Sequence, residues 1–122
     1  MFTHVCVSAK NLQDSVQFYT SVLAPLGAQN LGPFGATSHG FRAGESMLLV
    51  MLPRDGKEAT HSNGGTLGFK APTQDAVDAF HAAGLANGGT DEGEPGPRMD
   101  GKVYGAYLRD PVGNKVCAYF GL

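Results

Sequence analysis

Residues 3–28, THVCVSAKNLQDSVQFYTSVLAPLGA, and residues 65–89, GTLGFKAPTQDAVDAFHAAGLANGG, read as one unit written twice. In each copy a short alternating segment precedes a Gln-Asp pair, an amphipathic segment with an aromatic residue in its third turn, and a closing glycine. The two copies lie about half the chain length apart. A doubled strand–helix unit in a chain of 122 residues predicts a pseudo-twofold fold with a cleft between its halves.

The local patterns define the elements of each copy. Residues 2–9 alternate as a strand does, with Val5 and Val7 on one face and His4, Cys6 and Ser8 on the other. Asn11 and Thr73 are the expected N-caps of two helices. The apolar faces of these helices are predicted from three- and four-residue spacing: Leu12, Val16, Tyr19, Leu23 and Leu26 in the first, and Ala76, Val77, Phe80 and Leu85 in the second.

The remaining segments complete the order βαβββ in both halves. Short strands are expected near Leu31, over 38–42 and over 46–52, and a terminal hairpin over 104–108 and 115–120 turns at Asp110-Pro111-Val112-Gly113-Asn114. Residues 90–101 are acidic and rich in Pro and Gly, which favours a long mobile loop over a site. The predicted class is α+β, one domain over 1–122 with modules 1–52 and 65–122 and linker 53–64, forming a curved mixed sheet around a cup.

The composition of the chain gives no reason to expect nucleic acid or a membrane as a partner. The net charge is −2, and no basic patch with interleaved aromatic residues occurs, so nucleic acid is not an expected partner. The longest apolar run, residues 47–52, is far too short to cross a membrane. The two cysteines lie within predicted strands and no export signal precedes them, which predicts free thiols in a reducing cytoplasm.

Three segments resemble the vicinal oxygen chelate superfamily, which includes glyoxalase I, bleomycin-resistance proteins, fosfomycin-modifying enzymes and extradiol dioxygenases. They are FYTSVLAPLG at 18–27, AVDAFHAAG at 76–84 and YLRDPVGNKV at 107–116, together with His4 in the first strand. The resemblance covers nearly the whole chain. It implies that each module curls its strands around a cup and that the cup holds a small molecule. Members often dimerise, so a homodimer is expected, with the modules paired within one chain or across two.

The resemblance also implies where a divalent metal would be held, by residues from the first and last strand of each module. In this chain those positions are His4, Leu48, Thr66 and Cys117, where members with a working metal site usually have His, Glu or Gln. Leu48 has no donor atom, and a hard divalent ion needs several oxygen or nitrogen ligands. A zinc-like ion on His4 and Cys117 would lack the usual third protein ligand, so the sequence favours a site without a metal.

His4 and Cys117 are the candidate catalytic residues, and each has an alternative role. His4 is either a strand histidine satisfied by a hydrogen bond inside the cup, or a ligand or general base. Cys117 is either a small buried apolar residue, a soft metal ligand, or a nucleophile activated by His4.

The candidate substrate-binding residues come from alternation and from the resemblance. Strand alternation places Lys115 and Tyr119 beside Cys117, and Thr66 beside Lys70. Arg98 follows a Pro-Gly-Pro stretch and could clamp an anion. The full set is Thr66, Leu48, Lys70, Arg98, Tyr104, Tyr107, Lys115 and Tyr119.

Two functions from different classes are compatible with these residues. The resemblance implies a glyoxalase-like lyase or isomerase, similar to lactoylglutathione lyase, with a degraded metal site. The alternative is a non-catalytic protein that binds or sequesters a small, antibiotic-like molecule. The two differ in one observable: an enzyme loses turnover when His4 becomes Ala, whereas a binding protein has no turnover to lose.

Overall fold

The computed structural model describes all 122 residues and contains two modules with the same element order. Each module is a strand, a helix and three strands, and each forms a four-stranded sheet with the strand order first-fourth-third-second. The predicted α+β class with two βαβββ modules is therefore confirmed. The bounds are β1 His4–Ser8, α1 Leu12–Leu23, β2 Gln29–Pro33, β3 Ser38–Ala43, β4 Ser46–Met51, β5 Thr66–Lys70, α2 Gln74–Ala86, β6 Thr90–Arg98, β7 Val103–Arg109 and β8 Lys115–Phe120.

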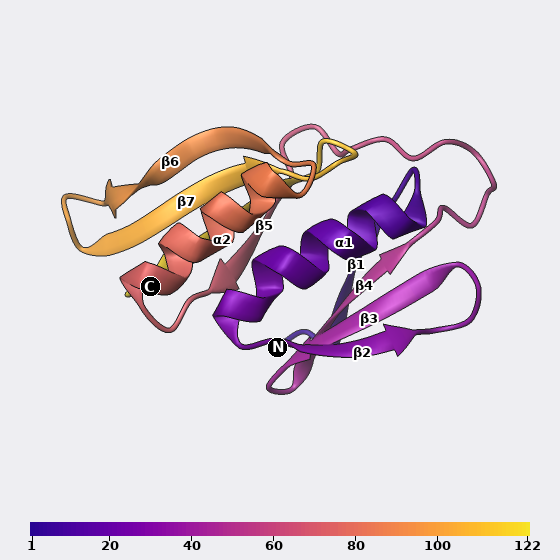
Figure 1. Ribbon diagram of the computed structural model, residues 1–122, viewed down its shortest axis with the longest axis horizontal. Helices are drawn as coiled ribbons and strands as arrows, with labels where there is room; N and C mark the ends of the chain where they lie inside the picture. Colours follow the sequence, from indigo (N-terminus) through magenta and orange to yellow (C-terminus); the bar gives the residue numbers. More distant parts are fainter.

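The two helices pack against each other, and the two sheets flank the pair (Figure 1). In each module the first strand runs parallel to the last, β1 beside β4 and β5 beside β8, while the other neighbours are antiparallel. Neither β1 nor β5 pairs with a strand on its other side. The seam between the modules is thus bordered by two unpaired strand edges. None of the helices is long and apolar enough to cross a membrane.

Both predicted N-caps are confirmed. The Asn11 side chain accepts a hydrogen bond from the Asp14 amide at 3.0 Å, and Thr73 accepts one from the Ala76 amide at 3.0 Å. Each bond satisfies one of the amides that a helix start leaves without an internal partner. α1 stops at Leu23, and a short 3-10 turn, Ala24–Leu26, contains Pro25 and is closed by Gly27 at a φ of 83°.

One continuous core lies between the helices and the sheets. Phe18, Tyr19 and Val22 of α1 and Val77 and Phe80 of α2 are fully buried in it. Leu85, predicted to be on the apolar face of α2, is 47% exposed. Gly84 is the buried residue at this end of the helix. It lies so close to Leu108 that an added Cβ would be 2.3 Å from a Leu108 methyl group.

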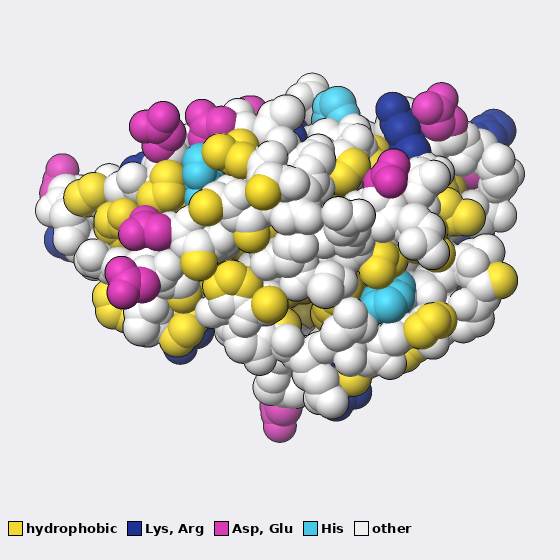
Figure 2. Space-filling view, in the orientation of Figure 1, with side chains coloured by type: hydrophobic (Ala, Val, Ile, Leu, Met, Phe, Trp, Pro, Cys, Tyr) yellow, Lys and Arg dark blue, Asp and Glu magenta, His cyan; other side chains and the backbone are white.

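Residues 90–98 are not the loop that their composition predicts. They form β6, which pairs with β7 through two irregularities in register, between Asp91 and Gly93 and between Gly93 and Gly96. Proline is tolerated here because β6 is an edge strand with one side free of ladder bonds. Asp91 bonds His81 of α2 at 2.8 Å, on the helix side, where Figure 2 shows acidic side chains gathered over β6 and α2.

The modules are joined by one buried carboxylate, that of Asp110 in the turn between β7 and β8. Its Oδ1 accepts the amides of Val112, Gly113 and Asn114 at 2.9–3.0 Å. Its Oδ2 accepts the Tyr19 hydroxyl of α1 at 2.7 Å and the Asn114 side-chain amide at 2.8 Å. The same Asn114 amide group donates to the Ser8 carbonyl of β1 at 3.1 Å. A turn of the second module therefore holds two elements of the first.

We expect Tyr19→Phe to lower the free energy of unfolding by about 2 kcal/mol, because it deletes a buried hydrogen bond to a charged acceptor. Urea denaturation followed by circular dichroism measures the change. The matched control is Tyr104→Phe, which deletes an equally short bond, to Asp78 at 2.7 Å, at an exposed site. Equal losses in the two variants would contradict the special role of the Asp110 contact.

Candidate functional site

The side of β5, β7 and β8 that faces away from α2 carries most of the predicted site residues of the second module. Leu67, Val116 and Leu108 pack into the core, so the alternate residues of the same strands point outward. The register places Thr66 opposite Lys115, Gly68 opposite Cys117, and Lys70 opposite Tyr119. Cys117 is in turn opposite Tyr107 of β7. We call this surface, made of Thr66, Gly68, Lys70, Gly105, Tyr107, Lys115, Cys117 and Tyr119, the open face.

Glycines on neighbouring strands make room for the large polar side chains of this face. An added Cβ at Gly105 would lie 2.6 Å from the Tyr119 ring, and one at Gly93 would lie 3.3 Å from Tyr107. Arg98 folds back along β6, and a Cβ at Gly96 would lie 3.2 Å from its Nη1. The aromatic rings and the guanidinium therefore lie close against bare backbone, which fixes their positions.

Two tyrosine hydroxyls form the centre of the open face. The hydroxyls of Tyr107 and Tyr119 are 2.8 Å apart, and their rings meet edge to face with centroids separated by 5.8 Å. The Lys115 ammonium lies 5.2 Å from the centroid of the Tyr107 ring. The hydrogen bond to Tyr119, with partial burial, raises the pKa of Tyr107 to about 12. Tyr107 is therefore a neutral phenol at physiological pH and can donate a hydrogen bond.

Cys117 lies beneath these rings and is 5% exposed. Burial raises the pKa of its thiol, and the nearby Lys115 and a hydrogen bond with Tyr107 only partly oppose that shift. The protonated thiol is accordingly the dominant form at neutral pH, and a thiolate nucleophile is disfavoured there. A cavity of about 370 Å³ opens beside it, bordered by Thr66, Gly68, Lys70, Cys117 and Tyr119.

Five of the predicted substrate-binding residues meet on this face, and Arg98 lies beside it. The five are Thr66, Lys70, Tyr107, Lys115 and Tyr119. Arg98 is near enough to Tyr107 to lower the pKa of that phenol slightly, against the larger raising effects. The glycines that accommodate these side chains were not predicted, because which side chain covers a strand glycine depends on pairing between strands distant in sequence.

Two of the predicted substrate-binding residues, Leu48 and Tyr104, face the helix side of their sheets. Leu48 pairs in register with Val5 and belongs to the core under the helices, so it does not share a face with His4. Tyr104 lies three residues from Tyr107, and alternation therefore turns it to the helix side, where its hydroxyl donates to Asp78 of α2. Neither residue therefore belongs to the open face, and the prediction that they contact a ligand stays a prediction.

His4 is separate from Cys117. It is exposed on β1, and its Nδ1 lies 2.9 Å from the Thr3 hydroxyl. None of the larger cavities is bordered by both residues. No three His, Cys, Asp or Glu side chains gather anywhere in a way that could hold a metal ion. The residues at the expected positions, one imidazole, one leucine, one threonine and one buried thiol, do not fit a divalent metal.

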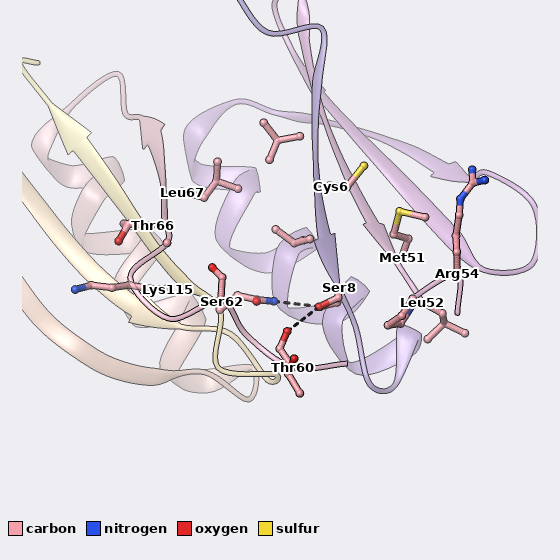
Figure 3. A pocket seen from close by; sticks show the side chains of 15 residues that line it. Cys6, Ser8, Met51, Leu52, Arg54, Thr60, Ser62, Thr66, Leu67 and Lys115 are labelled. Atoms are coloured by element: carbon pink, nitrogen blue, oxygen red, sulfur yellow. Dashed lines mark hydrogen bonds between the residues drawn. The ribbon is translucent and has the colours of Figure 1, made fainter. Parts of the chain in front are cut away.

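The largest cavity, about 610 Å³, lies at one end of the seam between β1 and β5 and is closed by the segment between the modules. Figure 3 shows Cys6 and Met51 on one side of this seam and Thr66 and Lys115 pointing to the other, with Leu67 between them. Ser8 borders the cavity and donates to the Thr60 carbonyl at 3.4 Å. Residues from the outward faces of both modules therefore border one cavity from opposite sides.

Known proteins share this architecture. Residues 2–118 match the family described as the glyoxalase/bleomycin resistance protein/dioxygenase superfamily. A glyoxalase/bleomycin resistance protein from Albidiferax ferrireducens T118 is 45% identical, with a TM-score of 0.90 and 98% and 97% of the two chains covered. No curated protein matches.

More distant solved structures share the fold alone. A family enzyme from Burkholderia phytofirmans PsJN is 21% identical, with a TM-score of 0.74 and 98% of both chains covered. A lactoylglutathione lyase from Agrobacterium tumefaciens is 24% identical, with a TM-score of 0.70 and 99% of this chain and 93% of that chain covered.

We expect elemental analysis of untagged protein, purified without chelator, to find well below one divalent metal ion per chain, because the donor set is incomplete. His4→Ala and Cys117→Ala should leave that content unchanged. One equivalent of zinc or a similar ion that disappears in both variants would instead establish a His4/Cys117 metal site. It would make a metal-dependent enzyme the better hypothesis.

Proposed function

The chain belongs to the glyoxalase/bleomycin resistance protein/dioxygenase superfamily, and we propose that it binds a small anionic organic molecule on the open face without a divalent metal. One observation carries the proposal. Two phenol hydroxyls lie 2.8 Å apart, and three cationic side chains belong to their surroundings. Lys70 is opposite Tyr119 in register, Lys115 lies 5.2 Å from the Tyr107 ring centroid, and Arg98 is close enough to act on Tyr107 electrostatically. Phenols and cations together supply several hydrogen-bond donors and positive charge for a carboxylate or enolate oxygen.

The cations near the tyrosines have no carboxylate partners of their own. The guanidinium of Arg98 donates only to the carbonyls of Glu94 and Pro97. Glu92, whose pKa is lowered mainly by its hydrogen bond with Arg109 and to a smaller extent by the charge of Lys115, is already paired with Arg109 at 3.0 Å. Lys70 forms no salt bridge, and neither does Lys115. An anionic ligand would therefore gain charge-assisted bonds without first having to break existing ion pairs.

Binding fits these groups better than catalysis does. A nucleophile needs a thiolate, and the raised pKa of Cys117 keeps the thiol protonated. A general base needs to reach the ligand, and His4 belongs to the other module and does not border any of the larger cavities. A lyase or isomerase using His4 and Cys117 is the alternative. Turnover of lactoylglutathione that is lost in His4→Ala would establish that alternative and overturn the binding function.

We expect benzoate, used as a probe, to bind the protein more tightly than benzyl alcohol, its neutral counterpart, in isothermal titration calorimetry. Lys115→Ala should weaken benzoate binding about tenfold and Tyr119→Phe about fivefold, since each removes a donor to the anion. Lys57→Ala is the matched control, because this exposed lysine lies in the segment between the modules. Equal affinities for the two probes, or equal losses in Lys57→Ala, would contradict an anion site on the open face.

A second copy of the chain would complete the cup. The open face borders the seam along β5, and the outward face of the first module, with Cys6 and Met51, lies across the same seam (Figure 3). The unpaired edges of β1 and β5 are the elements that a second copy could cover. We include a homodimer in the proposal, with the first module of one copy closing the open face of the other.

Sedimentation equilibrium tests the homodimer. We expect a dimer at micromolar concentration and its dissociation in Cys6→Asp, because a carboxylate would be buried at the new contact. Cys6 is exposed in the single chain, so this substitution should leave the fold intact. Leu85→Asp, at an exposed position on α2, is the control and should remain dimeric. A wild-type monomer at all concentrations would remove the second copy from the proposal.

A further inference from the structure

A second cavity, of about 370 Å³, opens at the other end of the seam between the modules. Ten of the fourteen residues that border it are hydrophobic. The buried side chains Leu23, Phe41 and Leu48 come from the first module, and the partly buried Leu67 and Phe69 come from the second. A small-molecule site is typically a mostly apolar cleft of this size with few polar groups.

This cavity differs from the open face in position and chemistry. Its apolar side chains point to the helix side of both sheets, whereas Tyr107, Lys115 and Tyr119 point away from it. The apolar cavity and the cavity beside Cys117 share three residues of β5, Thr66, Gly68 and Phe69, and the other residues that border them differ. The inference drawn from this cavity therefore does not rest on the proposed function of the open face.

Arg42 is the only charged residue that borders the apolar cavity. Its Nη2 donates to the sulfur of Met47 at 3.3 Å, and it takes part in no salt bridge. A thioether is a weak acceptor, so most of the donor capacity of the guanidinium is unused. The exposed Phe2 also borders the cavity and extends its apolar surface to the solvent.

We propose that this cavity binds an amphipathic monocarboxylate, with its apolar body between the modules and its carboxylate on Arg42. A guanidinium matches a carboxylate in shape and charge, forming two parallel hydrogen bonds. A cavity of about 150 Å³ already holds benzene. The larger cavity here accommodates a substituted aromatic ring or a medium-length alkyl chain.

Octanoate and its neutral counterpart octanol, titrated calorimetrically into the full-length protein, test the proposal. Octanoate should bind, and Arg42→Gln should weaken it about tenfold or more while leaving octanol unchanged. Arg54→Gln is the matched control, since this exposed arginine borders the other cavity. Ala28→Leu should weaken octanoate and octanol together, because it fills the apolar space.

The outcomes separate this cavity from the open face and from a contact between copies. Loss of octanoate binding in Lys115→Ala and Tyr119→Phe, with Arg42→Gln unchanged, would place the ligand on the open face and overturn the proposal. Octanoate binding that competes with self-association, measured by sedimentation, would assign the cavity to a second copy and also overturn it. Arg42 is exposed, so thermal unfolding of Arg42→Gln should match that of the unaltered protein and keep its result interpretable.

Discussion

The carboxylate of Asp110 is the contact on which the arrangement of the molecule depends. It is 4% exposed and accepts five hydrogen bonds, three from the backbone of its own turn and two from the side chains of Tyr19 and Asn114. A buried charge is tolerated only when its oxygens are fully satisfied, and here they are. Burial and the neighbouring carboxylate in turn raise the pKa of Tyr19, which keeps that hydroxyl a donor.

The contact ties the two modules together beside the larger cavity of the seam, which Asn114 borders. Tyr19 belongs to α1, and Asn114 reaches Ser8 at the end of β1, so the turn holds the first module at two points. The same turn sets where β7 ends and β8 begins, and hence the register that places Tyr107 opposite Cys117. The positions of the tyrosine pair and of the seam therefore share one structural cause.

Much of the fold could be predicted from the sequence, because the local patterns for helix caps, turns and strands agreed with one another. The caps at Asn11 and Thr73 and the turn at 110–114 each need particular side chains, and sequence displays those directly. Residues 90–98 were misread because Pro and Gly content indicates a loop, while an edge strand with irregular register tolerates both. Leu48 and Tyr104 face the helix side of their sheets, because a shift of one residue along a strand moves a side chain to the opposite face.

Other features of the site depend on contacts between strands that are distant in sequence. Nothing local shows that Gly105 lies under Tyr119, or that Arg42 borders a cavity completed by Leu67 and Phe69 of the other module. These contacts decide the chemistry. A divalent ion would concentrate two charges at one point and polarise a bound oxygen. Lysine, arginine and neutral phenols instead distribute single charges and donors over a surface, which stabilises a bound anion with much less activation of it. The anion binding that we propose for the open face rests on this dispersed positive charge.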